Sequence, residues 1–183
     1  TPSLKGSYYG VSRVLYGQMA DNASSSYEKE AYLSVSKKHR DSCIAYYPVY
    51  SLPYIIAKAD RNIDQKKSDE TLQLLIPYFP KIKSNDPNSA IVSYIISQAY
   101  KQKNDRLQEK KWLSISALLD LQLSKKEYIS LRSLAFLLFE DGEIDRAYTY
   151  IKRSLDDAVA CNARLRTYEI SKMLPIISES YQQ

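Results

Sequence analysis

The chain is poor in the residues on which β-rich folds, metal sites and membrane-spanning segments depend. Only four of its 183 residues are glycine and seven are proline, which leaves little material for the many tight turns of an all-β fold. Two cysteines and one histidine, with no Cys-x-x-Cys pattern, are too few for a standard four-ligand zinc site. The longest apolar run, residues 134–139, has six residues, whereas a transmembrane helix needs about 20. We expect no metal, no cofactor and no membrane span within this sequence.

The residues that are abundant are typical of helices. Leu, Ile, Ala, Lys, Glu and Gln fill long periodic stretches, and 44% of the chain is hydrophobic. Tyrosine occurs 17 times, against three phenylalanines and one tryptophan. A large amphipathic ring suits the core and the shallow grooves between helices, whose rims contact water. The composition therefore predicts an all-α protein.

One helix-turn-helix hairpin, centred on Gly142, recurs more faintly twice upstream. Gly142 stands just past a helix end, where a positive φ costs glycine little, so the chain reverses there. A step back of roughly 38 residues places Asn104 at an equivalent turn, and a further step of about 37 places Lys67. Apolar residues at helical spacing flank Gly142: Leu131, Leu134, Ala135, Leu138, Ile144, Ala147, Tyr148, Ile151 and Leu155. The sequence thus predicts three repeated hairpins.

Capping residues and prolines predict nine helices, joined by connections of about two to six residues. Ser25 and Glu28 form a capping-box pattern, and Asn162 directly precedes the last apolar run. We therefore expect Ser25 and Asn162 each to cap a helix. Gly6, Gly10 and Gly17 in the first helix permit close approach of a neighbour. The expected first residues or caps are Leu4, Ser25, Ser51, Ser68, Asp86, Asp105, Ser124, Ile144 and Asn162.

The hairpin around Gly142 resembles the tetratricopeptide repeat. That pattern has a small residue midway along the first helix, a large apolar one three later and a small one early in the second, matched by Ala135, Leu138 and Ala147. Val159 stands where proline is usual, and the repeat is a few residues longer. Because one hairpin buries too little apolar surface alone, we expect a tetratricopeptide-like right-handed superhelix of stacked antiparallel hairpins. It forms one domain over residues 1–183, with an N-terminal hairpin (1–48), three repeats (50–161) and a capping helix (162–183).

Charge and reactive side chains give little support to nucleic-acid binding or catalysis. The net charge is +5 and the pI about 9.0, but acidic residues are interleaved with both basic clusters, residues 37–40 and 101–111. We interpret these clusters as solvated helix faces and expect no direct nucleic-acid binding; retention on heparin would indicate the opposite. His39 lies four residues before Cys43 on one helix face, and acidic pairs lie at helix ends. We interpret these groups as structural and expect no enzymatic activity.

Roughly the last 50 residues carry a tighter resemblance. It rests on residues 133–135, 142–148, 150–154, 161–167 and 169–177. These segments are similar to the sensor portion of membrane-anchored, tetratricopeptide-containing transcriptional regulators of Bacteroidota. The resemblance implies an exported domain at the periplasmic face of the inner membrane, followed by an anchor absent from this sequence. It also implies a link to carbohydrate utilisation. A cytoplasmic location is the second interpretation.

We expect a ligand-sensing or protein-interaction domain that binds through its concave groove. In the predicted register the first helix of each hairpin projects aromatic and polar side chains towards that groove: Tyr54, Arg61, Tyr94, Gln98, Lys101, Arg132 and Phe136. Rings interleaved with cations suit an extended peptide, an acidic protein tail or an oligosaccharide face, and the sequence does not choose among them. The alternative is a structural scaffold that homodimerises and has no small-molecule ligand of its own.

Overall fold

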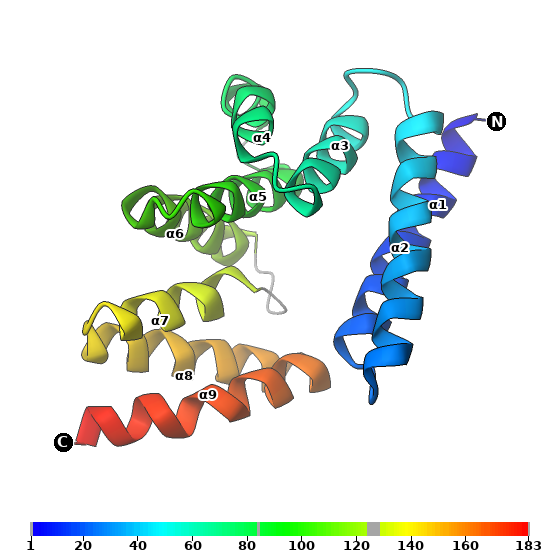
Figure 1. Ribbon diagram of the computed structural model, residues 1–183. Helices are drawn as coiled ribbons and strands as arrows, with labels where there is room; N and C mark the ends of the chain where they lie inside the picture. The colour runs from blue at the N-terminus through cyan, green and yellow to red at the C-terminus, as the bar shows by residue number, and fades with distance from the viewer. Residues whose placement is uncertain (1, 84, 124–128, 183) are drawn as a thin grey trace. The chain divides into compact units, whose positions relative to one another are not determined.

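The computed structural model describes residues 2–83, 85–123 and 129–182, and every regular element among them is a helix (Figure 1). The all-α helical-repeat fold class is therefore confirmed. Contacts between Cα atoms group the chain into two compact units, residues 1–75 and 76–183, which are described separately. The assignment of residues 1–183 to a single domain stays a prediction.

The first unit contains α1 (Pro2–Asp21), α2 (Ser26–Tyr46), α3 (Leu52–Asp64) and α4 (Ser68–Leu75). The second contains η1 (Phe79–Lys81), α5 (Asn88–Gln102), α6 (Arg106–Gln122), α7 (Ser130–Glu140), α8 (Ile144–Ala160) and α9 (Arg164–Gln182).

Three turns inside hairpins repeat with one period. The residue just past the first helix has a positive φ at Lys66, Asn104 and Gly142, at +58°, +57° and +79°. Successive members of this set are 38 residues apart. The expected turn residue Lys67 is thus wrong by one position. The faint first repeat has a lysine where glycine or asparagine would have marked the turn, so the sequence alone did not fix its register.

Each of these turns is closed by the same two backbone hydrogen bonds. At the clearest one, the Glu143 N–H donates to the Leu138 carbonyl at 2.9 Å, and the Gly142 N–H donates to the Phe139 carbonyl at 3.0 Å. This is the Schellman pattern, which satisfies carbonyls that a helix end leaves without partners. Equivalent pairs of bonds close the turns at Lys66 and Asn104. The paired helices therefore run antiparallel.

Asn162 does not cap the last helix as expected. It has φ +55° and follows the end of α8, so it is the left-handed residue that terminates α8. The Ala163 N–H donates to the Ala158 carbonyl at 2.8 Å, and the Ala163 carbonyl accepts from Thr167, so Ala163 takes the cap position of α9. Asparagine is common both in the left-handed conformation that ends a helix and in the extended conformation of a helix cap. The sequence pattern could therefore not tell the two roles apart.

Other helix starts follow the expected capping chemistry in part. The side chains of Ser25 and Asp105 accept from the backbone N–H groups of Glu28 and Gln108, at 3.2 and 3.1 Å. Ser68 is the first helical residue of α4 and not its cap, because the preceding turn leads directly into the helix. The expected cap Ser124 lies outside the described residues. No helix within the described ranges is long and apolar enough to span a bilayer.

The second unit is a stack of helices in sequence order. Neighbouring pairs α5 and α6, α6 and α7, α7 and α8, and α8 and α9 pack against one another (Figure 1). The three residues that match the tetratricopeptide pattern, Ala135, Leu138 and Ala147, are fully buried in its core. Ile151 and Ile170 belong to the same core, and each such isoleucine contributes about 1.5–3 kcal/mol by burial. Small residues at the pattern positions let adjacent helices approach closely enough to stack.

The first unit is held together by close packing and by buried charge. A Cβ at Gly6 would lie 2.8 Å from the Tyr47 ring, so glycine is what lets α1 approach α2 there. Arg40 on α2 donates to Asp64 on α3 at 2.6 Å, and Arg13 on α1 donates to Asp60 on α3 at 2.5 Å. Arg40 is buried, which corrects its interpretation as part of a solvated basic face. These ion pairs tie α3 to the α1–α2 hairpin.

Candidate ligand-binding site

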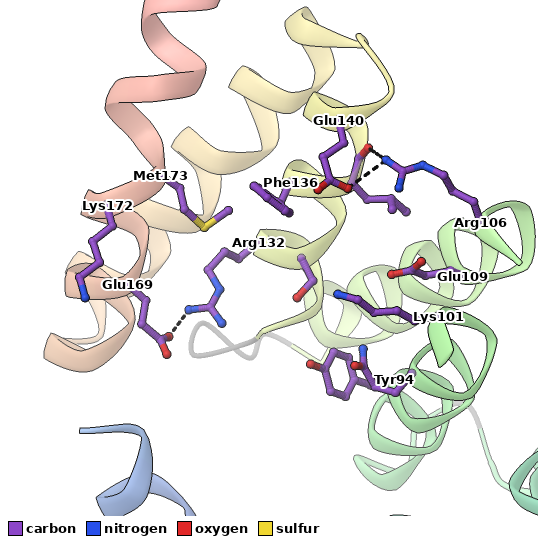
Figure 2. A pocket seen from close by; sticks show the side chains of 13 residues that line it. Tyr94, Lys101, Arg106, Glu109, Arg132, Phe136, Glu140, Glu169, Lys172 and Met173 are labelled. Atoms are coloured by element: carbon purple, nitrogen blue, oxygen red, sulfur yellow. Dashed lines mark hydrogen bonds and ion pairs between the residues drawn. The ribbon is translucent and has the colours of Figure 1, made fainter. Parts of the chain in front are cut away.

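A hollow of about 540 Å³ opens on the second unit between α5, α6, α7 and α9 (Figure 2). Its volume is in the range of small-molecule sites, about 300–1,000 Å³. We call it the groove. Three of these helices hold corresponding places in the array. Helices α5 and α7 are the first helices of successive hairpins, and α9 is the helix that caps the last hairpin. The start of α6 supplies the remaining wall through Arg106 and Glu109.

Five of the seven side chains predicted to face a ligand line this groove. They are Tyr94, Gln98, Lys101, Arg132 and Phe136. Tyr94 and Arg132, like Gln98 and Phe136, stand 38 residues apart, so the repeat period brings equivalent positions of two hairpins together. Their role in binding stays a prediction.

Tyr54 and Arg61, the other two predicted residues, lie on α3 in the first unit. The Arg61 guanidinium is 4.0 Å from the Asp41 carboxylate on α2. The groove described for the second unit does not include either side chain, and their assignment also stays a prediction.

An ion-pair network fixes the α9 wall of the groove to α7. The guanidinium of Arg132 on α7 donates to the Glu169 carboxylate on α9, and Arg166 donates to the same carboxylate at 2.8 Å. Arg166 is buried and Glu169 only partly exposed, so water screens this network less than a surface pair. Figure 2 shows the Arg132–Glu169 pair crossing one side of the hollow. Arg132 is therefore held in place before any ligand arrives.

A second network braces the opposite end of the groove. Arg106 of α6 donates to the Asp141 carboxylate, to Glu140 at 3.1 Å and to the Leu137 carbonyl at 3.0 Å. Lys110 contacts the other Asp141 oxygen at 2.5 Å. Hydrogen bonds from Lys110 and Arg106 hold the pKa of Asp141 below its ordinary value. These contacts lock α6 onto the end of α7.

The aromatic side chains of the groove differ in what they can offer a ligand. Phe136 is 41% exposed, so its ring is open to solvent. Tyr94 packs against the buried core and has less free surface. Lys172 lies with its Nζ 4.1 Å from the centre of the Tyr168 ring, at the α9 edge. Phe136 is thus the apolar surface on which a ligand ring can stack.

Glu109 is a groove residue that the sequence analysis did not identify, because it was assigned to a solvated charged face. It is only 7% exposed, and burial raises the pKa of its carboxyl above the ordinary value. In the 38-residue register it is equivalent to Ala147, where the tetratricopeptide pattern has a small residue. A carboxylate at a position of a small residue is the signal that could have found it.

The groove offers charged, polar and aromatic side chains as binding groups. Acidic side chains Glu109, Glu140 and Glu169 alternate with basic ones, and the described residues contain no cluster of three or more His, Cys, Asp or Glu side chains able to hold a metal ion. What it presents is one open aromatic ring, several fixed hydrogen-bond donors and the carboxylate of Glu109. Such a set is suited to recognition of a polar ligand.

The comparison with known families agrees with this architecture. Residues 1–172 match the family described as the SusR N-terminal TPR domain. The chain belongs to this family. No match was found among curated proteins or among solved structures. The SusR-type TPR match covers both units, so the repeat assignment does not depend on the C-terminal segments alone.

In this TPR domain the sequence predicted the groove residues that follow the repeat period better than those at helix ends and on the capping helix α9. The residues on α5 and α7 follow from the repeat period, because both helices are first helices of a hairpin. The contributions of Arg106, Glu140, Glu169 and Met173 were missed. They come from helix ends and from the capping helix, where no repeat partner marks the groove-facing positions.

Proposed function

We propose that this TPR domain is the ligand-sensing part of a transcriptional regulator linked to carbohydrate utilisation. The proposal takes the groove of the second unit as the binding site, with no cofactor and no catalytic reaction. The resemblance of the last 50 or so residues to exported sensor domains supports a location at the periplasmic face of the inner membrane. Membership of the SusR-type family supports the regulatory role.

One observation carries the proposal. The repeat period brings Tyr94, Gln98, Lys101, Arg132 and Phe136 from two hairpins to a single hollow of about 540 Å³. A hollow of this size suits a small molecule, whereas a standard protein interface covers about 800 Å² on each partner. Arg132 is held in place by Glu169, so binding costs little side-chain ordering. The groove is therefore suited to an oligosaccharide or a short peptide segment.

Replacement of Phe136 tests this proposal. The chain is first applied to an immobilised array of neutral and uronic-acid oligosaccharides, and the affinity of the best-retained glycan is measured by isothermal titration calorimetry. We expect Phe136→Ala to weaken binding about tenfold, because a lost aromatic stack is worth about 0.5–1.5 kcal/mol beyond area. Tyr94 is a poorer choice, since it packs against the core and its loss would also lower stability.

Ile91 provides the matched control for that replacement. It lies on α5, is 40% exposed and does not line the groove. Ile91→Ala should leave affinity within about twofold and should match Phe136→Ala in melting temperature. Equal affinity of the wild type and the Phe136 variant for a bound glycan, or no retention of any glycan, would overturn the proposal.

The homodimerisation scaffold remains the second candidate because of α1. This helix exposes large apolar residues at helical spacing: Leu4, Tyr8, Val11 and Leu15. Leu4 and Val11 are 71% and 72% exposed, and such a stripe is self-complementary in a two-fold helix pair. Light scattering over a concentration series distinguishes the candidates. A dimer that dissociates on Val11→Asp, together with no glycan binding, favours the scaffold.

A further inference from the structure

We propose that one end of the α1–α2 hairpin binds the surface of an anionic lipid bilayer. This end is formed by the start of α1 and by the loop between α2 and α3, residues 47–51. The inference is separate from the groove, because both segments lie within residues 1–75. Five large side chains are exposed there, and we call them the tip: Leu4, Tyr8, Tyr46, Val49 and Tyr50.

Close packing joins the two segments of the tip into one surface. A Cβ at Gly6 would lie 2.8 Å from the Tyr47 ring, so the loop begins against the first turns of α1. The rings of Tyr9 and Tyr46 stack with 5.6 Å between their centres, and Tyr8 meets Tyr9 edge-on at 5.4 Å. Figure 1 shows the start of α1 beside the end of α2, with the loop to α3 leaving from the same end.

The loop holds Tyr50 in an unfavourable backbone conformation. Its φ is +65°, a left-handed value that is rare for a residue with a large side chain. Tyr50 is nevertheless 78% exposed and its neighbour Val49 is 60% exposed, so neither side chain is buried in the core in return. Backbone strain of this kind is concentrated where a segment has a function. The loop therefore presents an aromatic and an aliphatic side chain to something outside the chain.

The chemistry of the tip matches the interface of a bilayer. Tyrosine has an apolar ring and a polar hydroxyl, and it is enriched where membranes meet water. Leucine and valine beside it supply apolar surface that can enter the boundary between headgroups and acyl chains. An exposed patch of this composition on a soluble helical unit is typical of a surface that contacts a protein or a membrane.

The charges around the tip favour anionic lipid. Residues 1–20 and 42–59 contain no aspartate or glutamate. Lys5 lies with its Nζ 5.5 Å from the centre of the Tyr46 ring and so places a cation at the tip. Asp41, the acid that precedes the loop on α2, is 3.9 Å from Arg40 and 4.0 Å from Arg61. Basic residues next to interfacial side chains attract anionic headgroups.

A second copy of the chain fits the tip less well than a bilayer does. A standard protein interface uses about 20–30 residues on each partner, whereas the tip has five. A bilayer needs no surface of matching shape, because binding to it adds apolar insertion to electrostatic attraction. Lipid is therefore the occupant that the size, composition and charge of the tip favour.

Sedimentation of the full chain with lipid vesicles tests the proposal. We expect the wild type to pellet with vesicles of phosphatidylethanolamine and phosphatidylglycerol, more weakly as salt is raised, and more weakly with phosphatidylcholine alone. Tyr50→Asn should weaken binding about tenfold, because the ring is lost. Asparagine tolerates the left-handed conformation, so the melting temperature of this variant should not fall.

Tyr27→Asn is the matched control. Tyr27 is 81% exposed in the first turn of α2, at the opposite end of that helix from Tyr46, so this variant should bind vesicles like the wild type. Tyr50→Trp should keep binding, because tryptophan is also an interfacial residue. Brominated lipids should quench the added indole, whereas Trp112 is nearly buried in the second unit.

Three results would overturn the proposal. They are no pelleting of the wild type with anionic vesicles, equal pelleting of the wild type and Tyr50→Asn, and equal pelleting with anionic and phosphatidylcholine vesicles. Self-association that Tyr50→Asn abolishes, without vesicle binding, would assign the tip to a second copy instead. Phe136→Ala should pellet like the wild type, since Phe136 lies in the groove. Failure of the groove assignment and failure of this proposal are thus distinguishable.

Discussion

At the scale of single residues, the three turns that share one period have different tolerance for their backbone conformation. Gly142 adopts its positive φ without steric cost, whereas Lys66 has a Cβ and pays about 1–2 kcal/mol for a left-handed conformation. Asn104 is intermediate, because asparagine visits this region more readily than lysine. The same turn geometry is therefore reached from three residue types with different strain.

Opposite substitutions at two of these turns test this account. Gly142→Ala should lower the free energy of unfolding by about 1 kcal/mol, although no atom lies within 4 Å of the added Cβ, because the strain is in the backbone. Lys66→Gly should raise it by up to about 1 kcal/mol, since the relief of strain exceeds the added entropy of the unfolded chain. Urea denaturation measures both. A loss of stability in both variants would contradict the account.

Single residues also show what the sequence could and could not reveal about the site. Tyr94 and Arg132 were predictable, because a period of 38 residues relates them and both lie on first helices of hairpins. Glu109 was not predicted, because charge alone indicates a solvated face and its burial depends on how tightly α6 packs on its neighbours. Comparison with Thr71 and Ala147 at equivalent positions would have shown the exception.

At the scale of helices, the contact between α6 and the α7–α8 turn depends on charge. Asp141 accepts from Arg106 and contacts Lys110, and Lys110 also donates to Glu143 at 2.8 Å. The side chain of Asp141 is 20% exposed, so the network is partly shielded from water. Networks of this kind contribute more than isolated surface pairs, which are worth about 0–1 kcal/mol.

Asp141→Asn tests the contribution of this network through its pH dependence. At neutral pH the variant should lose about 1 kcal/mol of stability. The pKa of Asp141 is lowered in the folded state, so its stabilisation is present above the ordinary value of 3.8 and is lost as the pH falls through the folded pKa. The stability difference between variant and wild type should therefore shrink below about pH 3.8.

The exposed acid of α8, Asp156, supplies the control for this measurement. Asp156→Asn should change stability by less than about 0.5 kcal/mol at any pH. Melting temperatures recorded across the acid range give both curves. A difference between wild type and Asp141→Asn that stays constant with pH would show that the carboxylate charge is not what stabilises the contact.

Helix ends were predicted less reliably than helix existence, and the reason is physical. Ser25 and Asp105 cap as expected because their side chains have no competing role. Asn162 terminates α8 instead of starting α9. The turn between the two helices is tight, so an asparagine there can sterically either end the first helix or cap the second. Local propensity cannot separate these cases, because the choice depends on the packing of α8 against α9.

At the scale of the whole molecule, the repeat pattern predicted the fold class and the element order correctly. Period, capping residues and buried small residues agree with one another, and such agreement across levels is what specifies a helical array. The division into residues 1–75 and 76–183 was not predicted, because it depends on contacts between repeats that a periodic pattern leaves unspecified. The groove follows from the same stacking, since an open array leaves the first helices of its hairpins accessible.

Hydrogen–deuterium exchange of the full chain, with and without the glycan it retains best, tests the central claim most directly. The account predicts slower exchange in α7 and in the groove-facing part of α9, residues 164–173, when the glycan is bound. Exchange within residues 1–75 should stay unchanged, because none of the described groove residues lies there. Protection confined to residues 1–75, or none in α7 and α9 despite binding, would contradict the assignment of the site.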